Sequence, residues 1–259
     1  MIEPRPSVQF SLEGAVGVVT LNRPRRYNAL TIPMMRRLQH ALQTLDDNTA
    51  VGCVVIRATG PGFCTGQDIK VLDRYYRHHR AAELGDIIRN HYNPVIERIA
   101  TMKRVVIAAV QGVAAGAGLS LAMACDLRVA GRSAAFVPAF AKLGLIPGLG
   151  GTSALVESVG LARAMELALL VDRMSAEQAA RVGLVNRVTD DDELTETVMG
   201  WARRIASFSR EATQQTKRAL RVAAGLALGG NLDAEAHAES RCAADPAHRD
   251  LVTAFLSPH

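Results

Sequence analysis

Two stretches of small residues could place backbone N–H groups directly against a ligand. Residues 63–70 (FCTGQDIK) and residues 111–120 (QGVAAGAGLS) each follow a short apolar, β-branched run. Small side chains let the backbone approach a ligand closely. Loops at the ends of neighbouring strands can aim two N–H groups and a helix dipole at one oxygen atom. Either loop alone could be a tight strand-to-helix turn, but the pair favours an oxygen-binding site.

A third glycine-rich stretch, residues 144–152 (GLIPGLGGT), predicts another turn that opens a helix. Residues 112–118 also fit the GxxxGxG phosphate loop of a short-chain dehydrogenase. That alternative fails on context, because the loop lies in mid-chain and no acidic residue follows the next strand at the right distance. It also fails because Tyr75, Tyr76 and Tyr92 have no lysine four residues on.

The elements that must position these loops follow an α/β pattern. A helix is predicted over residues 32–45 with Thr31 as its N-cap, and another over residues 119–124. Buried parallel strands are typically short, apolar and β-branched. Strands are predicted at residues 8–13, 16–21, 51–58, 105–110 and 127–130, the first two forming a hairpin around Gly14.

The later part of the chain is predicted to be mainly helical. Residues 73–93, rich in Tyr, His, Arg and Asp, predict a mobile helical lid, and the pattern becomes helical from Ser175 onward. We expect a core over residues 1–200 and a C-terminal helical subdomain over residues 201–259. Helices are expected at residues 194–207, 210–226 and 233–244.

Composition predicts a folded protein without a membrane span. Hydrophobic residues make up 49% and charged residues 21% of the 259 residues, as in ordinary globular proteins. No apolar run reaches the roughly 18 to 20 residues that a membrane span needs. Residues 1–6 do not predict a signal peptide, so a cytoplasmic location is expected.

Charge and cysteine content exclude other classes of protein. The net charge of +5 is compatible with nucleic acid, but aromatic residues are only 4% and the arginines are dispersed. No nucleic-acid partner is expected, and a phosphorylated small molecule explains the basic excess equally well. The cysteines are scattered without metal-ligand spacing, so no metal site or disulfide framework is predicted. They are interpreted as reduced thiols of the core or of a pocket wall: Cys53, Cys64, Cys125 and Cys242.

Four motifs in register resemble the crotonase superfamily, the enoyl-CoA hydratase/isomerase family. They are Asn22-Arg23-Pro24 with Asn28-Ala29-Leu30, residues 63–68, residues 112–126 and residues 136–152, and the likeness covers roughly residues 8–257. The third and fourth motifs are most similar to the phenylacetate-pathway ring-epoxide isomerases. The resemblance implies an α/β spiral of ββα units with a C-terminal helical trimerisation subdomain, assembled as a homotrimer or homohexamer. It implies acyl-CoA as substrate or ligand and no separate cofactor.

The resemblance also implies particular site residues. The thioester carbonyl would lie between the backbone N–H groups of Gln67 and Ala117. Basic residues near the CoA phosphates would be Arg25 and Lys70, and Phe255 would reach the CoA of a neighbouring subunit. The residues predicted at the CoA site are Arg25, Ala29, Gly66, Asp68, Lys70, Gly116 and Phe255.

Three positions depart from the family pattern. Ser120 and Phe140 stand where family hydratases carry two glutamates, and Gly148 stands where isomerases carry one acidic residue. Standard water addition and double-bond migration would both lack their proton carriers. A serine with no partner is a poor base, so the Ser120 hydroxyl is expected to bond back to the backbone.

Two functions from different classes therefore stay open. One is an acyl-CoA lyase or isomerase that uses non-standard residues. The other is a non-catalytic acyl-CoA-binding or regulatory protein. Phe140 makes the pocket more apolar, which favours a long or aromatic acyl chain under either reading. Residues of the predicted lid that could replace the acid or base are Asp73, His78, His79, Glu83, Asp86 and His91.

Overall fold

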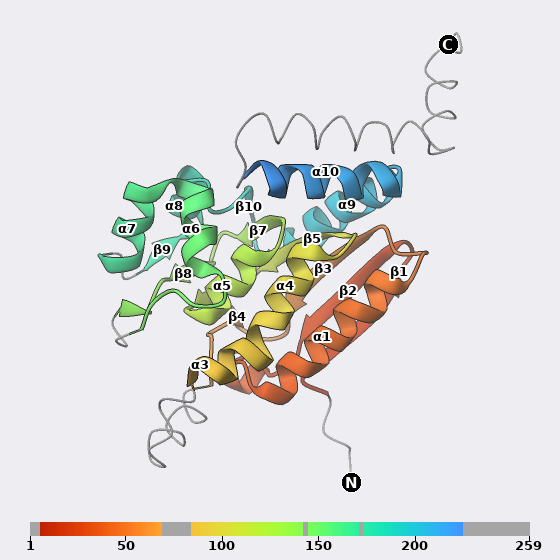
Figure 1. Ribbon diagram of the computed structural model, residues 1–259. Helices are drawn as coiled ribbons and strands as arrows, with labels where there is room; N and C mark the ends of the chain where they lie inside the picture. Colours follow the sequence, from red (N-terminus) through yellow and green to blue (C-terminus); the bar gives the residue numbers. More distant parts are fainter. Residues whose placement is uncertain (1–5, 69–83, 142–144, 171–172, 225–259) are drawn as a thin grey trace.

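The computed structural model describes residues 6–68, 84–141, 145–170 and 173–224 (Figure 1). Two residues predicted at the CoA site, Lys70 and Phe255, lie outside these ranges, as does the helix predicted over residues 233–244. The remaining predicted site residues lie within them.

The chain opens with the predicted hairpin. Strand β1 (Val8–Glu13) pairs antiparallel with β2 (Val16–Leu21), with the turn at Gly14, whose φ is +63°. A left-handed turn residue of this kind favours glycine. All of β2 except Thr20 is buried, whereas β1 exposes every residue after Val8, as expected of an edge strand.

Two sheets run through the described part of the chain. The larger has the order β1-β2-β3-β5-β7-β10 and the smaller the order β4-β6-β8-β9. Odd strands enter the larger sheet, the next strand enters the smaller one, and a helix follows; this repeats from β3 to β8. The predicted α/β spiral of ββα units is therefore confirmed. The strands are β3 (Cys53–Ala58), β4 (Gly62–Cys64), β5 (Val105–Val110), β6 (Val113–Ala115), β7 (Leu127–Gly131) and β8 (Ala135–Val137).

Helices cover both faces of the larger sheet (Figure 1). On one face lie α1 (Ile32–Asp47) and α4 (Asn93–Thr101), and on the other lies α9 (Leu194–Ala206). The predicted cap of α1 is confirmed, because the Thr31 hydroxyl accepts a hydrogen bond from the Met34 N–H at 3.4 Å. These two layers bury the alternating apolar residues of the parallel strands.

Helix α5 (Ala117–Ala124) is buried along its whole length. It begins two residues earlier than the predicted start at residue 119. The reason is close packing: a Cβ at Gly118 would lie 2.1 Å from the Cys64 carbonyl oxygen, so only glycine lets α5 lie against the end of β4. The glycines read as a loop in the sequence therefore include the first turn of a helix.

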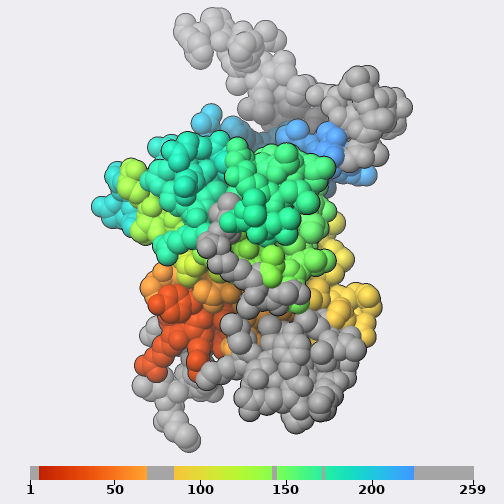
Figure 2. Space-filling model, turned by 90° about the vertical axis from the view of Figure 1, so that its left-hand side faces the viewer, coloured from red at the N-terminus to blue at the C-terminus, as the bar shows by residue number. Residues whose placement is uncertain are grey.

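The sequence predicted a helical pattern from residue 175 onward, but the structure also contains strands there. Two short strands, β9 (Met174–Ser175) and β10 (Arg187–Thr189), flank α8 (Ala176–Arg181) and extend both sheets. Strands of two and three residues carry too little alternation to be recognised in the sequence. Residues of α6 (Gly151–Val159) and α8, green to blue-green, lie in the upper part of the face in Figure 2, above red and orange residues from the N-terminal part of the chain.

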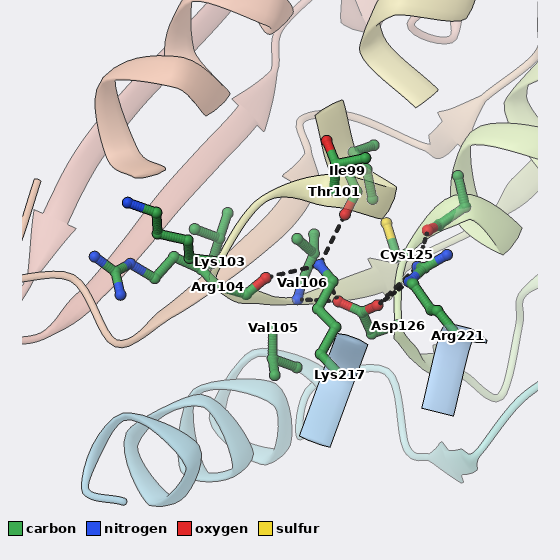
Figure 3. Close-up of polar contacts among 12 residues, drawn as sticks. Ile99, Thr101, Lys103, Arg104, Val105, Val106, Cys125, Asp126, Lys217 and Arg221 are labelled. Atoms are coloured by element: carbon green, nitrogen blue, oxygen red, sulfur yellow. Dashed lines mark hydrogen bonds and ion pairs between the residues drawn. The ribbon is translucent and has the colours of Figure 1, made fainter. Parts of the chain in front are cut away.

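The last described helix is fixed to the sheet by a buried lysine (Figure 3). Lys217, in α10 (Arg210–Ala223), donates hydrogen bonds to the carbonyl oxygens of Ile99 at 2.7 Å and Arg104 at 2.8 Å. It also pairs with Asp126 at 2.8 Å, and Arg221 pairs with the same carboxylate at 2.7 Å. Burial lowers the pKa of Lys217, and the carboxylate of Asp126 opposes that shift. The helix predicted at residues 194–207 is confirmed, and the one predicted at residues 210–226 is confirmed as far as Ala223, with residues 225 and 226 outside the described ranges. The division at residue 200 and the trimerisation role stay predictions.

Among the described residues, no helix is both long enough and apolar enough to cross a membrane.

Candidate functional site

The two glycine-rich loops predicted to meet do lie side by side. A Cβ at Gly66 would lie 3.0 Å from the Ala117 nitrogen and 3.0 Å from the Ala115 carbonyl oxygen. Gly66 has a φ of +89°, a conformation that favours glycine. The chain after β4 therefore passes close to the N-terminus of α5 at Gly66, the residue immediately before Gln67.

Both predicted donor groups are left open by the local backbone. Leu30 pairs with the residues on either side of Gln67: its N–H donates to the Gly66 oxygen at 2.7 Å and its oxygen accepts from the Asp68 N–H at 2.9 Å. Alternate residues of an extended chain point opposite ways, so the Gln67 N–H faces away from Leu30. Ala117 is the first residue of α5, where the N–H has no acceptor within the helix. Neither N–H donates to another residue of the described ranges.

The start of α5 adds a favourable electrostatic field. Gly116 has a φ of +47° and its N–H donates to the Val137 oxygen at 3.0 Å, which lets the helix begin abruptly after β6. The N-terminus of a helix carries a partial positive charge that favours an anionic oxygen. The ring of Phe140 lies beside the start of α5, since its Cε1 is 4.0 Å from the position of a Cβ at Gly116. The backbone N–H groups at the start of α5 therefore make the site polar, and the ring of Phe140 gives it an apolar side.

Asn28 links the first sequence motif, residues 22–30, to the chain that leads into the loop of Gln67. Its side chain is fully buried, and its amide donates to the carbonyl oxygens of Thr59 and Gly62 at 2.9 Å each. Its side-chain oxygen accepts from the Arg23 N–H at 2.7 Å. Because the buried amide makes all three hydrogen bonds, it fixes its own segment relative to the backbone around Thr59 and Gly62. Ala29, beside it, is also buried.

Arg23 is a site residue that the sequence interpretation missed. Its guanidinium pairs with the Asp68 carboxylate at 2.9 Å and also donates to the Ala29 carbonyl oxygen. It therefore holds the chain immediately after Gln67. The residues are 45 positions apart, and no sequence signal joins them except that Arg23 lies in the same motif as Asn28. Arg25, which was predicted to contact phosphate, is exposed.

The three positions without carboxylates differ in their surroundings. Ser120 is only 1% exposed and Phe140 only 7% exposed. The Ser120 hydroxyl has no hydrogen-bond partner among the described residues, so the prediction that it bonds back to the backbone is wrong. Around Gly148, no described heavy atom lies within 4 Å of the position that a Cβ would take. An added side chain there would meet open space.

The described cysteines are buried thiols, as predicted. The Cys64 thiol donates to the Asn28 carbonyl oxygen at 3.2 Å, close to the loop that carries Gln67. Burial raises the pKa of Cys53, Cys64 and Cys125 to about 12 in each case. A thiol that stays protonated is a weak nucleophile, so these residues belong to the core. Cys242 lies outside the described residues.

The predicted lid is described only from residue 84. Asp73, His78, His79 and Glu83 therefore lie outside the described ranges. Within α3 (Leu84–Ile87), Asp86 is exposed and pairs with Arg89 at 2.7 Å, whereas His91 is partly buried. Tyr92 is buried and its hydroxyl donates to the Leu30 oxygen at 3.4 Å, which anchors this end of the segment beside the Gln67 loop.

A cavity of about 630 Å³ lies elsewhere, between α6 and α10. It contains Met123 and Cys125 at the C-terminal end of α5, whereas the predicted donors lie at the N-terminal end. Two of its charged residues, Lys217 and Arg221, each pair with a third, Asp126. None of the predicted site residues lines it, so volume alone does not locate the chemistry. No group of three or more potential metal ligands occurs in the described ranges.

The fold and the paired loops define a crotonase-type protein. The family model for enoyl-CoA hydratase/isomerase matches residues 11–256, so the chain belongs to the enoyl-CoA hydratase/isomerase family. The family assignment made from the sequence motifs is confirmed.

Known proteins are similar in sequence or structure to almost the whole of this chain. A 1,2-epoxyphenylacetyl-CoA isomerase from Escherichia coli is 39% identical over 247 residues, covering 95% of this chain and 94% of the relative. A crystal structure of a protein from Mycobacterium abscessus, described as an enoyl-CoA hydratase/isomerase, superposes with a TM-score of 0.91 at 36% identity, covering 96% of each chain. One from Thermobifida fusca, described as an enoyl-CoA hydratase in complex with acetoacetyl-CoA, has a TM-score of 0.83 at 33% identity, covering 90% of this chain and 93% of that one.

Gly66→Ala is expected to weaken thioester binding at least about 10-fold, because even one displaced backbone donor costs an oxyanion site 10²-fold or more in catalysis. A methyl group at Gly66 would push the Gln67 loop away from Ala117. The matched control is Gly14→Ala, since Gly14 also has positive φ but has nothing within 4 Å of its Cβ position. Calorimetric titration with an acyl-CoA measures both affinities. Equal affinities in the two folded variants would contradict a role for the loop of Gly66 and Gln67 in thioester binding.

Proposed function

We propose that this protein binds an acyl-CoA thioester with its carbonyl oxygen between the N–H groups of Gln67 and Ala117. The observation that supports the proposal is the 3.0 Å approach of the Gly66 Cβ position to the Ala117 nitrogen, because Gly66 is the residue immediately before Gln67. Two such donors and the positive end of α5 would favour the negative charge that develops on a thioester oxygen. CoA contacts are proposed for Arg25, Ala29, Asp68, Lys70 and Phe255.

The chemistry that we propose is polarisation of the thioester and stabilisation of its enolate. Ser120, Phe140 and Gly148 supply no carboxylate, so the usual proton carriers of hydratases and isomerases would be absent. If the protein is an enzyme, it is a lyase or isomerase of acyl-CoA metabolism that takes its acid or base from elsewhere in the chain. The second candidate is a non-catalytic acyl-CoA-binding or regulatory protein, favoured by those same three residues. A cytoplasmic location stays a prediction.

Thermal-shift titration tests the binding proposal. Acyl-CoAs are expected to raise the melting temperature, since a ligand at 100 times its Kd adds about 2.7 kcal/mol to stability. Free CoA, which lacks the thioester carbonyl, serves as the matched ligand and should give a smaller shift. No shift with any acyl-CoA at millimolar concentration, with the protein folded, would rule the proposal out. Exchange of the acyl α-hydrogens with deuterated water then separates an enzyme from a binder.

We also infer a homotrimer or homohexamer. Large apolar side chains are exposed on α7 (Leu161–Leu169) at the spacing of one helix face: Leu161, Met165 and Leu169. Such exposed stripes are typical of surfaces that bury against another chain. Light scattering at micromolar concentration should give three or six times the 27.7 kDa chain mass. A monomer would contradict the inference.

A further inference from the structure

One guanidinium group ties the first sequence motif to the loop that carries Gln67. The Arg23 side chain donates to the Ala29 carbonyl oxygen with one nitrogen and pairs with the Asp68 carboxylate at 2.9 Å with another. The Arg23 side chain is 23% exposed and that of Asp68 14%, so water and salt screen this ion pair less than a fully exposed one. A planar guanidinium holds two acceptors in fixed directions, which a lysine ammonium does not do.

The two acceptors of Arg23 lie on either side of a single contact between two chain segments. Leu30 and Gln67 form an isolated bridge, outside the named strands of the two sheets. Ala29 precedes Leu30 on one segment, and Asp68 follows Gln67 on the other. The bridge has two backbone hydrogen bonds, at 2.7 and 2.9 Å, each worth only about 1 kcal/mol net. The grip of Arg23 on both segments is therefore a substantial part of their attachment.

This attachment decides where the Gln67 N–H points. The Gly66 carbonyl oxygen points toward Leu30, because it accepts a hydrogen bond from the Leu30 N–H. Across a trans peptide bond the next N–H points the opposite way, so the Gln67 N–H points away from Leu30. Rotation of the segment about the bridge would turn this N–H with it. The direction of the N–H therefore depends on how firmly Asp68 is held.

Arg23 is itself anchored to the core. Its backbone N–H donates to the Asn28 side-chain oxygen at 2.7 Å, and Asn28 is fully buried. It follows β2, an interior strand of the larger sheet, by two residues. A side chain that positions another group must first be fixed in place by its own neighbours. Arg23 meets this requirement, and it connects the larger sheet to Asp68.

We propose that Arg23 is a positioning residue for the thioester site, which orients the Gln67 N–H toward the thioester oxygen by holding Ala29 and Asp68 together. The inference rests on the proposed function, because Gln67 must be one of the two donors. Arg23 acts through the backbone and needs no contact with the ligand. The polarisation of the thioester carbonyl, and not only the affinity, should then depend on this arginine.

Arg23→Lys tests the inference, since it keeps the positive charge and removes the planar fork. Calorimetry measures the affinities for an acyl-CoA and for free CoA, and infrared difference spectroscopy measures the stretching frequency of an isotope-labelled thioester carbonyl. In the unaltered protein the frequency should fall on binding, because two donors polarise the carbonyl. Arg23→Lys should weaken acyl-CoA binding about 10-fold and move the frequency back toward that of the free thioester. The affinity for free CoA should stay unchanged.

The matched control is Arg132→Lys. Arg132 also pairs with two groups, Asp190 at 2.8 Å and Glu177 at 3.3 Å, but it lies on an exposed surface, so its replacement should change neither readout. Asp68→Asn is a second variant, which keeps the shape of the acceptor, removes its charge and should move the frequency in the same direction as Arg23→Lys. The double variant should add little to either single change, because the two residues act through one contact.

Each outcome decides a different point. A frequency shift that Arg23→Lys reduces, with free CoA binding unchanged, supports the inference, and if this variant does not fold, the frequency in Asp68→Asn decides in the same way. An unchanged frequency and acyl-CoA affinity in Arg23→Lys overturn the inference and leave the proposed thioester site intact. Equal losses for acyl-CoA and free CoA also overturn it, since Arg23 would then contact the CoA part itself. An unaltered protein that binds acyl-CoA no more tightly than free CoA, without a carbonyl shift, overturns the proposed function instead.

Discussion

Gly148→Asp is expected to raise the rate of double-bond isomerisation by about 10² to 10⁴-fold, the usual contribution of a positioned acid–base group. The position can accept a side chain, because no described heavy atom lies within 4 Å of its Cβ position. Its φ is not positive, so a residue other than glycine causes no left-handed strain. In family isomerases an acidic residue at this position carries a proton between two carbons, and Gly148→Asp would restore that group.

The control for this change is Gly148→Asn, which matches the shape of aspartate but cannot take up or release a proton in the same range. Conversion of a 3-enoyl-CoA to the conjugated 2-enoyl-CoA is followed by the rise in absorbance. The activity of the aspartate variant should increase as pH rises through the pKa of the new carboxyl group, because the ionised form is the base. Equal rates in the two variants, with thioester binding retained, would show that this loop does not reach the acyl carbons.

The fold was largely predictable because its strongest signals are local. The hairpin around Gly14 and helix α1 with its Thr31 cap follow from patterns that span about twenty residues. The glycine loops were also predictable, since positive φ at Gly66 and Gly116 leaves few other residue choices. Strands β9 and β10 were not, because their pairing in the two sheets and not their sequence defines them.

The site was predictable in its backbone and less so in its side chains. The order of the motifs predicted that the loops of Gly66 and Ala117 would lie close together, and they do, since both follow strands of one small sheet; the roles of Gln67 and Ala117 stay predictions. The Arg23–Asp68 pair joins residues that are distant in sequence, and only the folded chain shows which arginine of the motif turns inward. The unpaired state of Ser120 depends on every neighbouring segment, so a single-residue propensity predicted the wrong bond.

Hydration of crotonyl-CoA by the unaltered protein is expected to be very slow or undetectable. Two positioned acid–base groups are each worth about 10² to 10⁴-fold, and both positions carry side chains that cannot exchange protons usefully. Loss of absorbance of the conjugated thioester measures the rate. Robust turnover by the unaltered protein would show that another group serves as base, and His78, His79, Glu83 and Asp86 would be the first to replace.

The double variant Ser120→Glu with Phe140→Glu is expected to recover part of the missing hydration rate, because it places carboxylates at both positions that flank the acyl group in family hydratases. Both positions are buried, at 1% and 7% exposure, so the new carboxyl groups should have raised pKa values and lower the melting temperature. Hydration should therefore increase with pH as the base ionises. The pair Ser120→Gln with Phe140→Gln has nearly the same shape without acid–base groups, and should bind thioesters without hydrating them. Equal hydration rates in the two folded double variants would mean that positions 120 and 140 do not flank the reacting carbons.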